Sequence, residues 1–378
     1  MLYINIPFCA HKCGYCNFYS VVNMNSLDLY KKYLDALIKE YEIRINDLKN
    51  NFNKDIETIY IGGGTPSIIG ANMLEYFFEK LFEAINDSNK DKNEIKEITI
   101  EFNINDINMD SLKVISSIKN IRLSIGIQTF NEDSLKIINR QTSREDIINA
   151  LGLINKSRVE NISVDFICGL PLNDKEQSKK DIIRAFDLIP NIKHISLYYL
   201  EINDSFKNKW KEFLPTEEDS VNYYNIAAET IENFGLKRYE ISNYAVSGYE
   251  SIHNSGYWDL KDYLGIGAGA FGCYKNNRYE NTKNIKNYLE IVSENKAPAK
   301  NIEYLDKEKR KREFIFLSLR TVKGINFLYY KELFKEDFIN KYSKIINKHI
   351  KYFTISKEYL SIKKIYFDYA DEIILLLL

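Results

Sequence analysis

Short runs of β-branched and aromatic residues alternate with long helix-like stretches through the first 200 residues of the chain. Between the first three runs, apolar residues recur at helical spacing over 27–41 and 73–85. Strands that alternate with helices pair in parallel through right-handed crossovers. We therefore predict an α/β fold with a partial TIM-like (β/α)6 barrel. Its six strands are expected at 2–6, 56–61, 97–102, 122–128, 162–167 and 194–200.

The rest of the chain has a more varied pattern. Thr216 and Asp219 predict the start of a helix, and Gly235 predicts its end. The lysine-rich stretch 295–313 has the composition of a linker followed by a solvated helix start. Beyond it the pattern is mostly helical, with a strand-like run at 359–367. We predict a barrel domain over 1–236, an extension over 237–295, and a smaller, mainly helical C-terminal domain over 296–378.

Composition narrows the class of protein. The formal net charge of the 378 residues is −1, and the basic residues are scattered, which disfavours nucleic-acid binding. The start of the chain lacks the pattern of a signal peptide, and the run "IILLLL" is too short to span a bilayer. Five cysteines in so long a chain do not suggest a disulfide scaffold. We expect a cytoplasmic protein.

Polar residues with chemical potential lie at or near the carboxyl ends of the predicted strands. Glu101 ends the third strand, Gln128 ends the fourth, and Asp165 lies late in the fifth. The glycine-rich "GGGTP" at 62–66 follows the second strand. The carboxyl ends of parallel strands share one face, where ligands bind. The sequence therefore predicts one site built from several strand ends.

Three of the five cysteines, Cys9, Cys13 and Cys16, follow the first strand with C-x3-C-x2-C spacing. A structural zinc site needs four ligands, and the neighbouring His11 would be cramped between two of these cysteines. Three thiolates on a [4Fe–4S] cluster leave one iron free for a small molecule. An iron–sulfur cluster is favoured, while a zinc site and the absence of a metal remain alternatives. The isolated Cys168 and Cys273 are expected to be small buried residues.

These motifs resemble those of the radical S-adenosylmethionine (SAM) superfamily: three cysteines after a first strand, an aromatic Tyr15 before the last of them, and a glycine-rich loop after the second strand. In that superfamily the amino and carboxylate groups of SAM bind the free iron. The resemblance therefore implies a [4Fe–4S] cluster and SAM as cofactors. The cofactor-binding residues that it implies are Tyr3, Gly63, Gly64, Thr65, Glu101, Gln128, Arg140 and Asp165.

Within the superfamily the chain is similar to the group of oxygen-independent coproporphyrinogen III oxidases and related haem chaperones. "HNSGYW" at 253–258 resembles the H-N-x-x-Y-W signature of the chaperones, which implies haem binding by His253. The oxidases carry a further cysteine at the position of Phe18, and we place Phe18 among the cofactor-contacting residues. A chaperone is therefore favoured, and a coproporphyrinogen oxidase performing radical decarboxylation is the alternative.

The resemblance also implies partners for a haem chaperone. They are haem, an electron donor and haem-acceptor proteins such as respiratory enzymes, and the group is compatible with a homodimer and with peripheral membrane association. Two residues depart from the family pattern, Ile104 in place of a proline and Cys168 in place of an aromatic. "GAGAFG" at 267–272 lacks the surroundings of a dinucleotide site, and we expect it to form a wall of small residues beside a cofactor. His11, His194 and His349 are expected to be structural or exposed.

Overall fold

The six predicted strands lie side by side in the computed structural model of the chain, which describes residues 1–22, 24, 26–48, 56–88, 94–202 and 204–378. Each pairs in parallel with the next, which confirms the α/β prediction. The observed strands are β1 (Leu2–Ile6), β4 (Thr58–Gly63), β5 (Glu97–Asn103), β6 (Ile121–Gln128), β7 (Asn161–Cys168) and β8 (His194–Tyr199).

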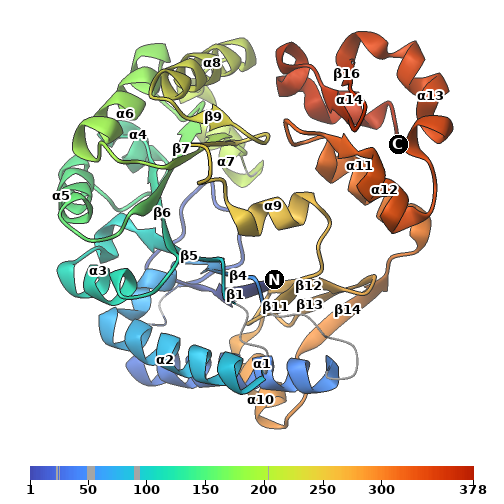
Figure 1. The fold of residues 1–378 in the computed structure, drawn as a ribbon. Coiled ribbons are helices and arrows are strands. Elements are labelled where there is room, and N and C mark those ends of the chain that lie inside the picture. Colours follow the sequence, from blue (N-terminus) through green and yellow to red (C-terminus); the bar gives the residue numbers. More distant parts are fainter. Residues whose placement is uncertain (23, 25, 49–55, 89–93, 203) are drawn as a thin grey trace.

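Helices cover the outer face of this curved sheet (Figure 1). The Thr216 side chain caps α8 (Glu217–Asn233) by accepting from the backbone nitrogen of Asp219, as the sequence predicts. Residues Ile59, Ile61, Ile98 and Ile100 of the strands are buried on that outer face. The helices of the barrel are α1 (Leu27–Leu48), α2 (Ala71–Ser88), α3 (Met109–Ser116), α4 (Glu132–Ile137), α5 (Arg144–Asn155), α6 (Lys175–Leu188), α7 (Asp204–Trp210) and α8 (Glu217–Asn233).

Three short strands from later in the chain widen the sheet to nine strands. β11 (Leu264–Ile266) pairs in parallel with β1. At the other edge β10 (Asn243–Ala245) pairs antiparallel with β8, and β9 (Lys237–Arg238) lies outside it. Among the described residues no strand pairing joins β11 to β9, so the barrel is open, consistent with the predicted partial barrel. The limits at 236 and 295 remain a prediction, although strands from between them belong to this sheet.

The strands turn a polar face inwards, because successive side chains on a strand point to opposite faces. Tyr3 stacks on Tyr60, whose hydroxyl reaches Glu101, and Ser124 donates to Asp165 at 3.3 Å. These contacts cross from strand to strand inside the barrel. Glu101 and Asp165 are only partly buried there, so the interior is not filled at their level. A polar, unfilled interior suits a ligand better than a structural core does.

The stretch predicted to be a linker is largely a strand. β12 (Phe271–Tyr274), β13 (Asn277–Asn281) and β14 (Ala299–Tyr304) form an antiparallel sheet, and α10 (Ile285–Ser293) lies between the last two. The next helix, α11 (Lys307–Ser318), is not fully solvated at its start. Lys311 is buried, and it pairs with Glu308 at 2.7 Å and Glu336 at 2.6 Å. Ion pairing allowed this lysine to be buried, which composition alone could not indicate.

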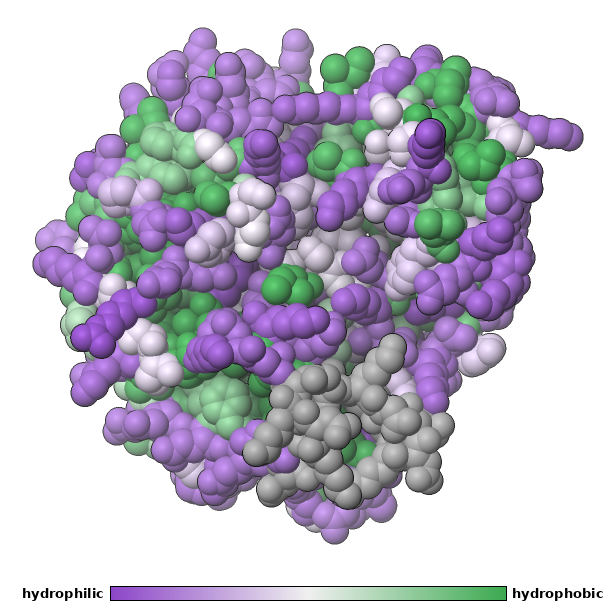
Figure 2. Space-filling view, viewed as in Figure 1, coloured by the Kyte–Doolittle hydropathy of each residue, from purple (hydrophilic) through white to green (hydrophobic). Residues whose placement is uncertain are grey.

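The C-terminal unit is mainly helical, as predicted, and has its own apolar core. The prediction of a strand-like run at 359–367 is right only for its first half, since a 3₁₀ helix (Lys364–Tyr369) follows the strand. The elements of the C-terminal unit after α11 are β15 (Ile325–Asn326), α12 (Phe327–Phe334), α13 (Phe338–Lys348), β16 (Phe353–Ile355), β17 (Tyr359–Ile362) and α14 (Ala370–Leu375). Hydrophilic side chains dominate the face in Figure 2, interrupted by small apolar groups. Within the described ranges, no helix is long and apolar enough to cross a membrane.

Candidate cofactor-binding site

The three clustered cysteines lie in a loop between β1 and α1, around the short pair β2 (Phe8–Cys9) and β3 (Val21–Val22). The backbone nitrogen of Gly14 donates to the Ile138 carbonyl at 2.8 Å, and the Asn139 side chain donates to the Lys12 carbonyl at 2.8 Å. These bonds fix the loop to the segment after α4. The cysteines are therefore held at the carboxyl end of the barrel, as predicted.

All three thiols are free and partly exposed. The Cys9 sulfur lies 3.4 Å from Thr65 Oγ1, and burial raises the pKa of Cys9, helped by the nearby Cys16 and Cys13 thiols. Burial also raises the pKa of Cys16. The Cys9 and Cys16 thiols therefore lie in partly desolvated surroundings. Raised thiol pKa values favour the protonated thiol until a metal centre replaces the proton.

The number of these thiols favours a cluster over a single zinc ion. Within the part of the chain that the structure describes, no three His, Cys, Asp or Glu side chains converge as one metal ion requires. A [4Fe–4S] cluster is bound differently, because each thiolate takes a separate iron. Three free, partly exposed thiols in one loop are the number that would leave one iron of the cluster open. His11 does not complete a zinc site, although its Nε2 lies 3.6 Å from the Cys13 sulfur.

The glycine-rich loop packs directly against the cysteine loop. The backbone nitrogens of Gly64 and Thr65 donate to the carbonyls of Ile6 and Phe8 at 3.0 and 2.8 Å. A Cβ on Gly64 would lie 2.6 Å from the Pro7 carbonyl carbon, and Gly63 has φ of 104°. Only glycine fits both positions. Gly63, Gly64 and Thr65 are therefore brought beside Cys9, as the sequence predicts.

Glu101 lies next to this loop, inside the barrel, and Asp165 lies near enough to Glu101 to affect its charge. The Tyr60 hydroxyl donates to Glu101 Oε1 at 2.7 Å. Burial, with a smaller contribution from Asp165, raises the pKa of Glu101 to about 7. Burial likewise raises the pKa of Asp165, whose Oδ1 is buried without a hydrogen-bond partner in the described structure. An unpaired buried carboxylate oxygen is a place where a ligand hydroxyl or amine can donate.

Gln128 and Arg140 complete the same end of the barrel. Gln128 has φ of 70° at a β-bulge, an unusual conformation for a residue other than glycine. Arg140 donates to the Gly126 carbonyl at 2.5 Å and to the Tyr15 hydroxyl at 3.0 Å. Its Nε is buried without a partner in the described structure. Gln128 therefore contributes a strained backbone conformation to the site, and Arg140 contributes an unpaired hydrogen-bond donor.

Tyr3 joins the site from β1, and its hydroxyl donates to Asn5 Oδ1 at 3.2 Å. Asn5 in turn donates to the Ala268 carbonyl at 2.6 Å, and a Cβ on Gly63 would lie 1.6 Å from its Oδ1. The small-residue run at 267–272 thus supports Asn5 at the end of β1. This is consistent with the expected wall of small residues beside the cofactor.

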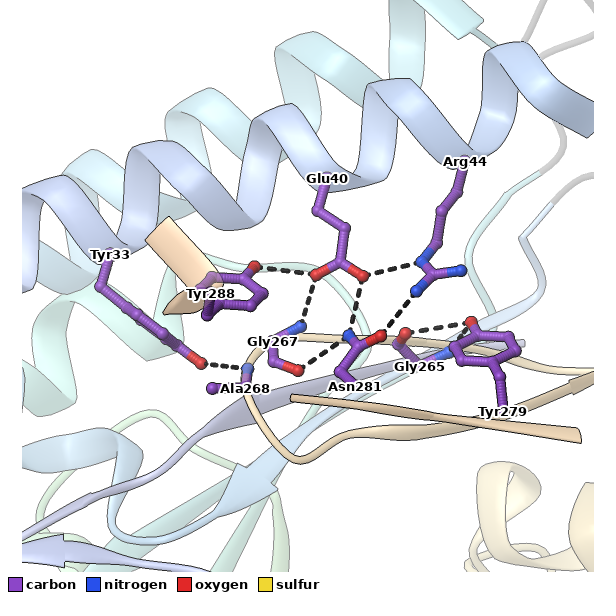
Figure 3. Close-up of polar contacts among 9 residues, drawn as sticks. All are labelled: Tyr33, Glu40, Arg44, Gly265, Gly267, Ala268, Tyr279, Asn281 and Tyr288. Atoms are coloured by element: carbon purple, nitrogen blue, oxygen red, sulfur yellow. Dashed lines mark hydrogen bonds and ion pairs between the residues drawn. The ribbon is translucent and has the colours of Figure 1, made fainter. Parts of the chain in front are cut away.

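A buried polar network holds that small-residue run against α1 (Figure 3). The Glu40 carboxylate accepts from the Gly267 nitrogen and from Tyr288, both at 2.8 Å. Arg44 pairs with Glu40 at 2.7 Å, and the hydroxyl of Tyr33 accepts from the Ala268 nitrogen at 2.8 Å. The network was not anticipated from the sequence. The roles of Tyr60 and Asn5 were not anticipated from the sequence either. Tyr60 lies two residues before Gly62 on β4, so both residues face the same side of the sheet. A Cβ on Gly62 would lie 2.9 Å from the Glu101 carboxyl, and this alternation was the available signal for Tyr60.

Two of the predicted residues are not part of this cluster of side chains. The Phe18 ring is 71% exposed and points to solvent, while the Phe18 carbonyl accepts from Lys12 at 2.6 Å. His253 lies in α9 (Ile252–Trp258), at the amino end of β4. Its side chain is fully buried, with both ring nitrogens hydrogen-bonded. Iron can bind His253 only if one of those bonds breaks.

The remaining cysteines and histidines behave as structural residues. Cys168 and Cys273 are buried, as predicted. His194 is buried between Ser163 Oγ at 2.8 Å and the Tyr239 hydroxyl at 2.9 Å. His349 follows α13 and is partly exposed. Ile104, which replaces the family proline, begins a 3₁₀ helix (Ile104–Asp106) and is buried.

Comparison with known proteins identifies the family. The sequence model of the radical SAM superfamily matches residues 3–180. Haem chaperone HemW of Lactococcus lactis is 33% identical over 355 residues, covering 92% of this chain and 88% of the relative. HemW of Bacillus subtilis is 32% identical, covering 91% and 87%. The chain belongs to the HemW family. HemW relatives thus match it almost end to end, beyond the barrel alone.

A solved structure supports the fold. Coproporphyrinogen III oxidase HemN from Escherichia coli, described as a radical SAM enzyme, aligns with a TM-score of 0.81. The alignment covers 100% of this chain and 89% of that one, at 19% sequence identity. At this identity the likeness establishes the fold alone. The HemW relatives, rather than this oxidase, therefore guide the functional assignment.

Proposed function

We propose that this protein is a haem chaperone that binds haem, a [4Fe–4S] cluster and SAM and transfers haem to acceptor proteins. The end-to-end similarity to proteins named haem chaperone HemW carries this proposal. The three free thiols beside a glycine-rich loop support the cluster and the SAM site. When bound, the cluster and SAM would supply the electron-transfer and radical chemistry of the superfamily.

In this proposal Cys9, Cys13 and Cys16 each hold one iron of the cluster. The backbone of Gly63 and Gly64 leaves room beside them for the polar end of SAM. The further residues assigned to the SAM site are Tyr3, Thr65, Glu101, Gln128, Arg140 and Asp165.

The unpaired polar atoms suit a ligand with both donors and acceptors. Asp165 Oδ1 can accept a hydrogen bond, and Arg140 Nε can donate one. Leaving such buried atoms unpaired costs about 1–3 kcal/mol each. A ligand that pairs with both would recover that free energy. SAM carries an ammonium group, a carboxylate and ribose hydroxyls, which are partners of the right kind.

Coproporphyrinogen III oxidase is the alternative function, and the HemN-like fold is compatible with it. Phe18 stands where the oxidases carry a further cysteine, and its exposed ring offers no metal ligand. This argues for the chaperone. Anaerobic incubation with coproporphyrinogen III, SAM and a reductant should give no protoporphyrinogen at catalytic rates. Sustained formation of that product would replace the chaperone proposal by the oxidase.

The proposed partners follow from the proposed function. An electron donor would reduce the cluster, and respiratory enzymes would be the acceptors of haem. We place the protein in the cytoplasm and propose a homodimer that associates peripherally with a membrane when it delivers haem. Haem-dependent dimerisation can be tested by light scattering with and without haem, and membrane association by vesicle flotation.

The decisive experiment measures cofactors and transfer together. Protein purified anaerobically and reconstituted should contain about four iron and four sulfide ions per chain. Added haem should bind stoichiometrically and then move to a haem-free acceptor, followed by the acceptor's absorption spectrum. A cluster without haem binding would leave a radical SAM protein but remove the chaperone function.

A further inference from the structure

Helix α9, which carries "HNSGYW", lies across the amino end of the barrel (Figure 1). Thr58 and Glu97 are the first residues of β4 and β5, and they pair with each other in register. His253 Nδ1 hydrogen-bonds with Thr58 Oγ1 at 2.9 Å. The cysteine loop follows the carboxyl end of β1, which runs parallel to β4, so it lies at the opposite end of the barrel. The motif therefore forms a floor beneath the candidate site instead of a wall beside the cluster.

The Glu97 carboxylate fixes the start of this helix. It is almost fully buried and accepts from the backbone nitrogens of Ile252 at 2.9 Å and His253 at 3.0 Å. It also accepts from the Ser251 hydroxyl at 3.1 Å. A carboxylate at a helix amino end satisfies nitrogens that lack partners within the helix. The position of the His253 backbone is thus set by β5.

The His253 side chain is equally constrained. Its Nε2 hydrogen-bonds with the Tyr257 hydroxyl at 3.0 Å, so both ring nitrogens have partners. Burial lowers the pKa of His253 to about 3, which keeps the ring neutral at physiological pH. A neutral ring supplies one donor and one acceptor, and these two partners use both. The two hydrogen bonds therefore hold the His253 ring in one orientation inside the barrel.

The Tyr60 ring packs against the His253 ring. The centroids of the His253 and Tyr60 rings are 5.4 Å apart, and Tyr60 also stacks on Tyr3 at 6.0 Å. The Tyr60 hydroxyl donates to Glu101 at 2.7 Å. His253 is therefore connected through Tyr60 to Glu101, a carboxylate of the proposed SAM site. Removing the ring would leave space into which Tyr60 can sink, away from Glu101.

We infer that His253 is a positioning residue for the SAM site: it supports Tyr60, which orients the Glu101 carboxylate. This inference rests on the proposed function, because it takes Glu101 as a SAM-binding residue. It gives the motif a role in the floor of the barrel that requires no contact between His253 and haem.

Two substitutions separate this role from that of a haem ligand. His253→Ala in the reconstituted protein should weaken SAM binding, measured by calorimetry, by about tenfold, the loss expected for one hydrogen bond to a charged group. His253→Gln retains a planar polar end that can reach Thr58 and should restore most of the affinity. SAM affinity is the readout of the positioning role, and haem stoichiometry and the haem absorption spectrum are measured beside it. Glutamine does not replace imidazole on haem iron. Loss of haem in both variants would therefore show that His253 is an axial haem ligand.

His194→Ala is the matched control, because His194 is a second buried, doubly hydrogen-bonded histidine at the amino end of the barrel. Thermal unfolding should report a similar loss of stability in His194→Ala and His253→Ala, with SAM affinity reduced only in the latter. Equal SAM affinity in His253→Ala and wild type would overturn the inference. A wild-type protein that binds no SAM would instead overturn the proposed function. Tyr60→Phe should reproduce the loss of affinity even if His253→Ala does not fold, and unchanged SAM binding in Tyr60→Phe would also contradict the inference.

Discussion

The Glu40 carboxylate accepts a hydrogen bond from the backbone nitrogen of Gly267 at 2.8 Å, which ties α1 to the loop after β11. The same carboxylate pairs with Arg44 at 2.7 Å, and Glu40 has no exposed surface. A buried ion pair contributes little net stability when intact, but removing one partner leaves the other charge uncompensated. The relationship is therefore a sensitive point of the fold.

Glu40→Gln should lower the free energy of unfolding by about 3–5 kcal/mol, because Arg44 loses its counter-ion in a buried site. Urea unfolding monitored by circular dichroism measures this directly. Glu42→Gln on the same helix is the control, since Glu42 is exposed and should change stability by less than about 0.5 kcal/mol. Equal effects of the two substitutions would show that the network adds nothing.

Cys13→Ala should abolish the visible absorbance of a reconstituted iron–sulfur cluster, because two thiolates cannot hold three irons. Cys168→Ala is the matched control, since Cys168 is buried in the apolar core of the barrel. Iron and sulfide analysis of both variants gives the result. A full cluster in Cys13→Ala would contradict the ligand assignment.

Gly63→Ala should prevent SAM binding and destabilise the protein, whereas Gly70→Ala should be milder. Both glycines have positive φ, 104° and 80°, so both substitutions carry backbone strain. Only at Gly63 would the new Cβ meet another group, 1.6 Å from Asn5 Oδ1, while nothing lies within 4 Å at Gly70. Calorimetric SAM titration and thermal unfolding of the two variants separate the clash from the strain. Similar behaviour of both variants would mean that the approach to Asn5 is unimportant.

The strand order and the convergence of Cys9, Glu101 and Asp165 were predictable because they follow from local patterns. A β-branched run followed by a helix gives a parallel strand, and the carboxyl end of each strand then has a known place. Each residue could be assigned to the site without knowing its side-chain partners.

The places of His253 and Glu40 could not be predicted in this way. His253 meets Thr58 across 195 residues of chain, and Glu40 meets Gly267 across 227. A short motif names the side chain but does not say whether it faces a ligand or the interior. In both cases tertiary packing set the role, and only the docking of α9 and of the loop after β11 revealed it.

The stability of the cofactor-free protein should depend on pH through Glu240. This side chain is fully buried, and burial raises its pKa from 4.5 to about 7. Between pH 4.5 and 7 the folded state keeps a proton that the unfolded chain releases, so the stability that Glu240 contributes is full below pH 4.5 and is lost as pH rises to 7. The shift corresponds to about 3 kcal/mol.

Glu240→Gln removes this titration. The difference in unfolding free energy between Glu240→Gln and wild type should therefore increase by about 3 kcal/mol in favour of the variant between pH 4.5 and pH 8. Urea unfolding at closely spaced pH values measures that difference. Because other buried carboxyls titrate equally in both proteins, their contributions cancel in the subtraction. A difference that stays constant across this range would mean that Glu240 is ionised in the folded protein at pH 5, despite its burial.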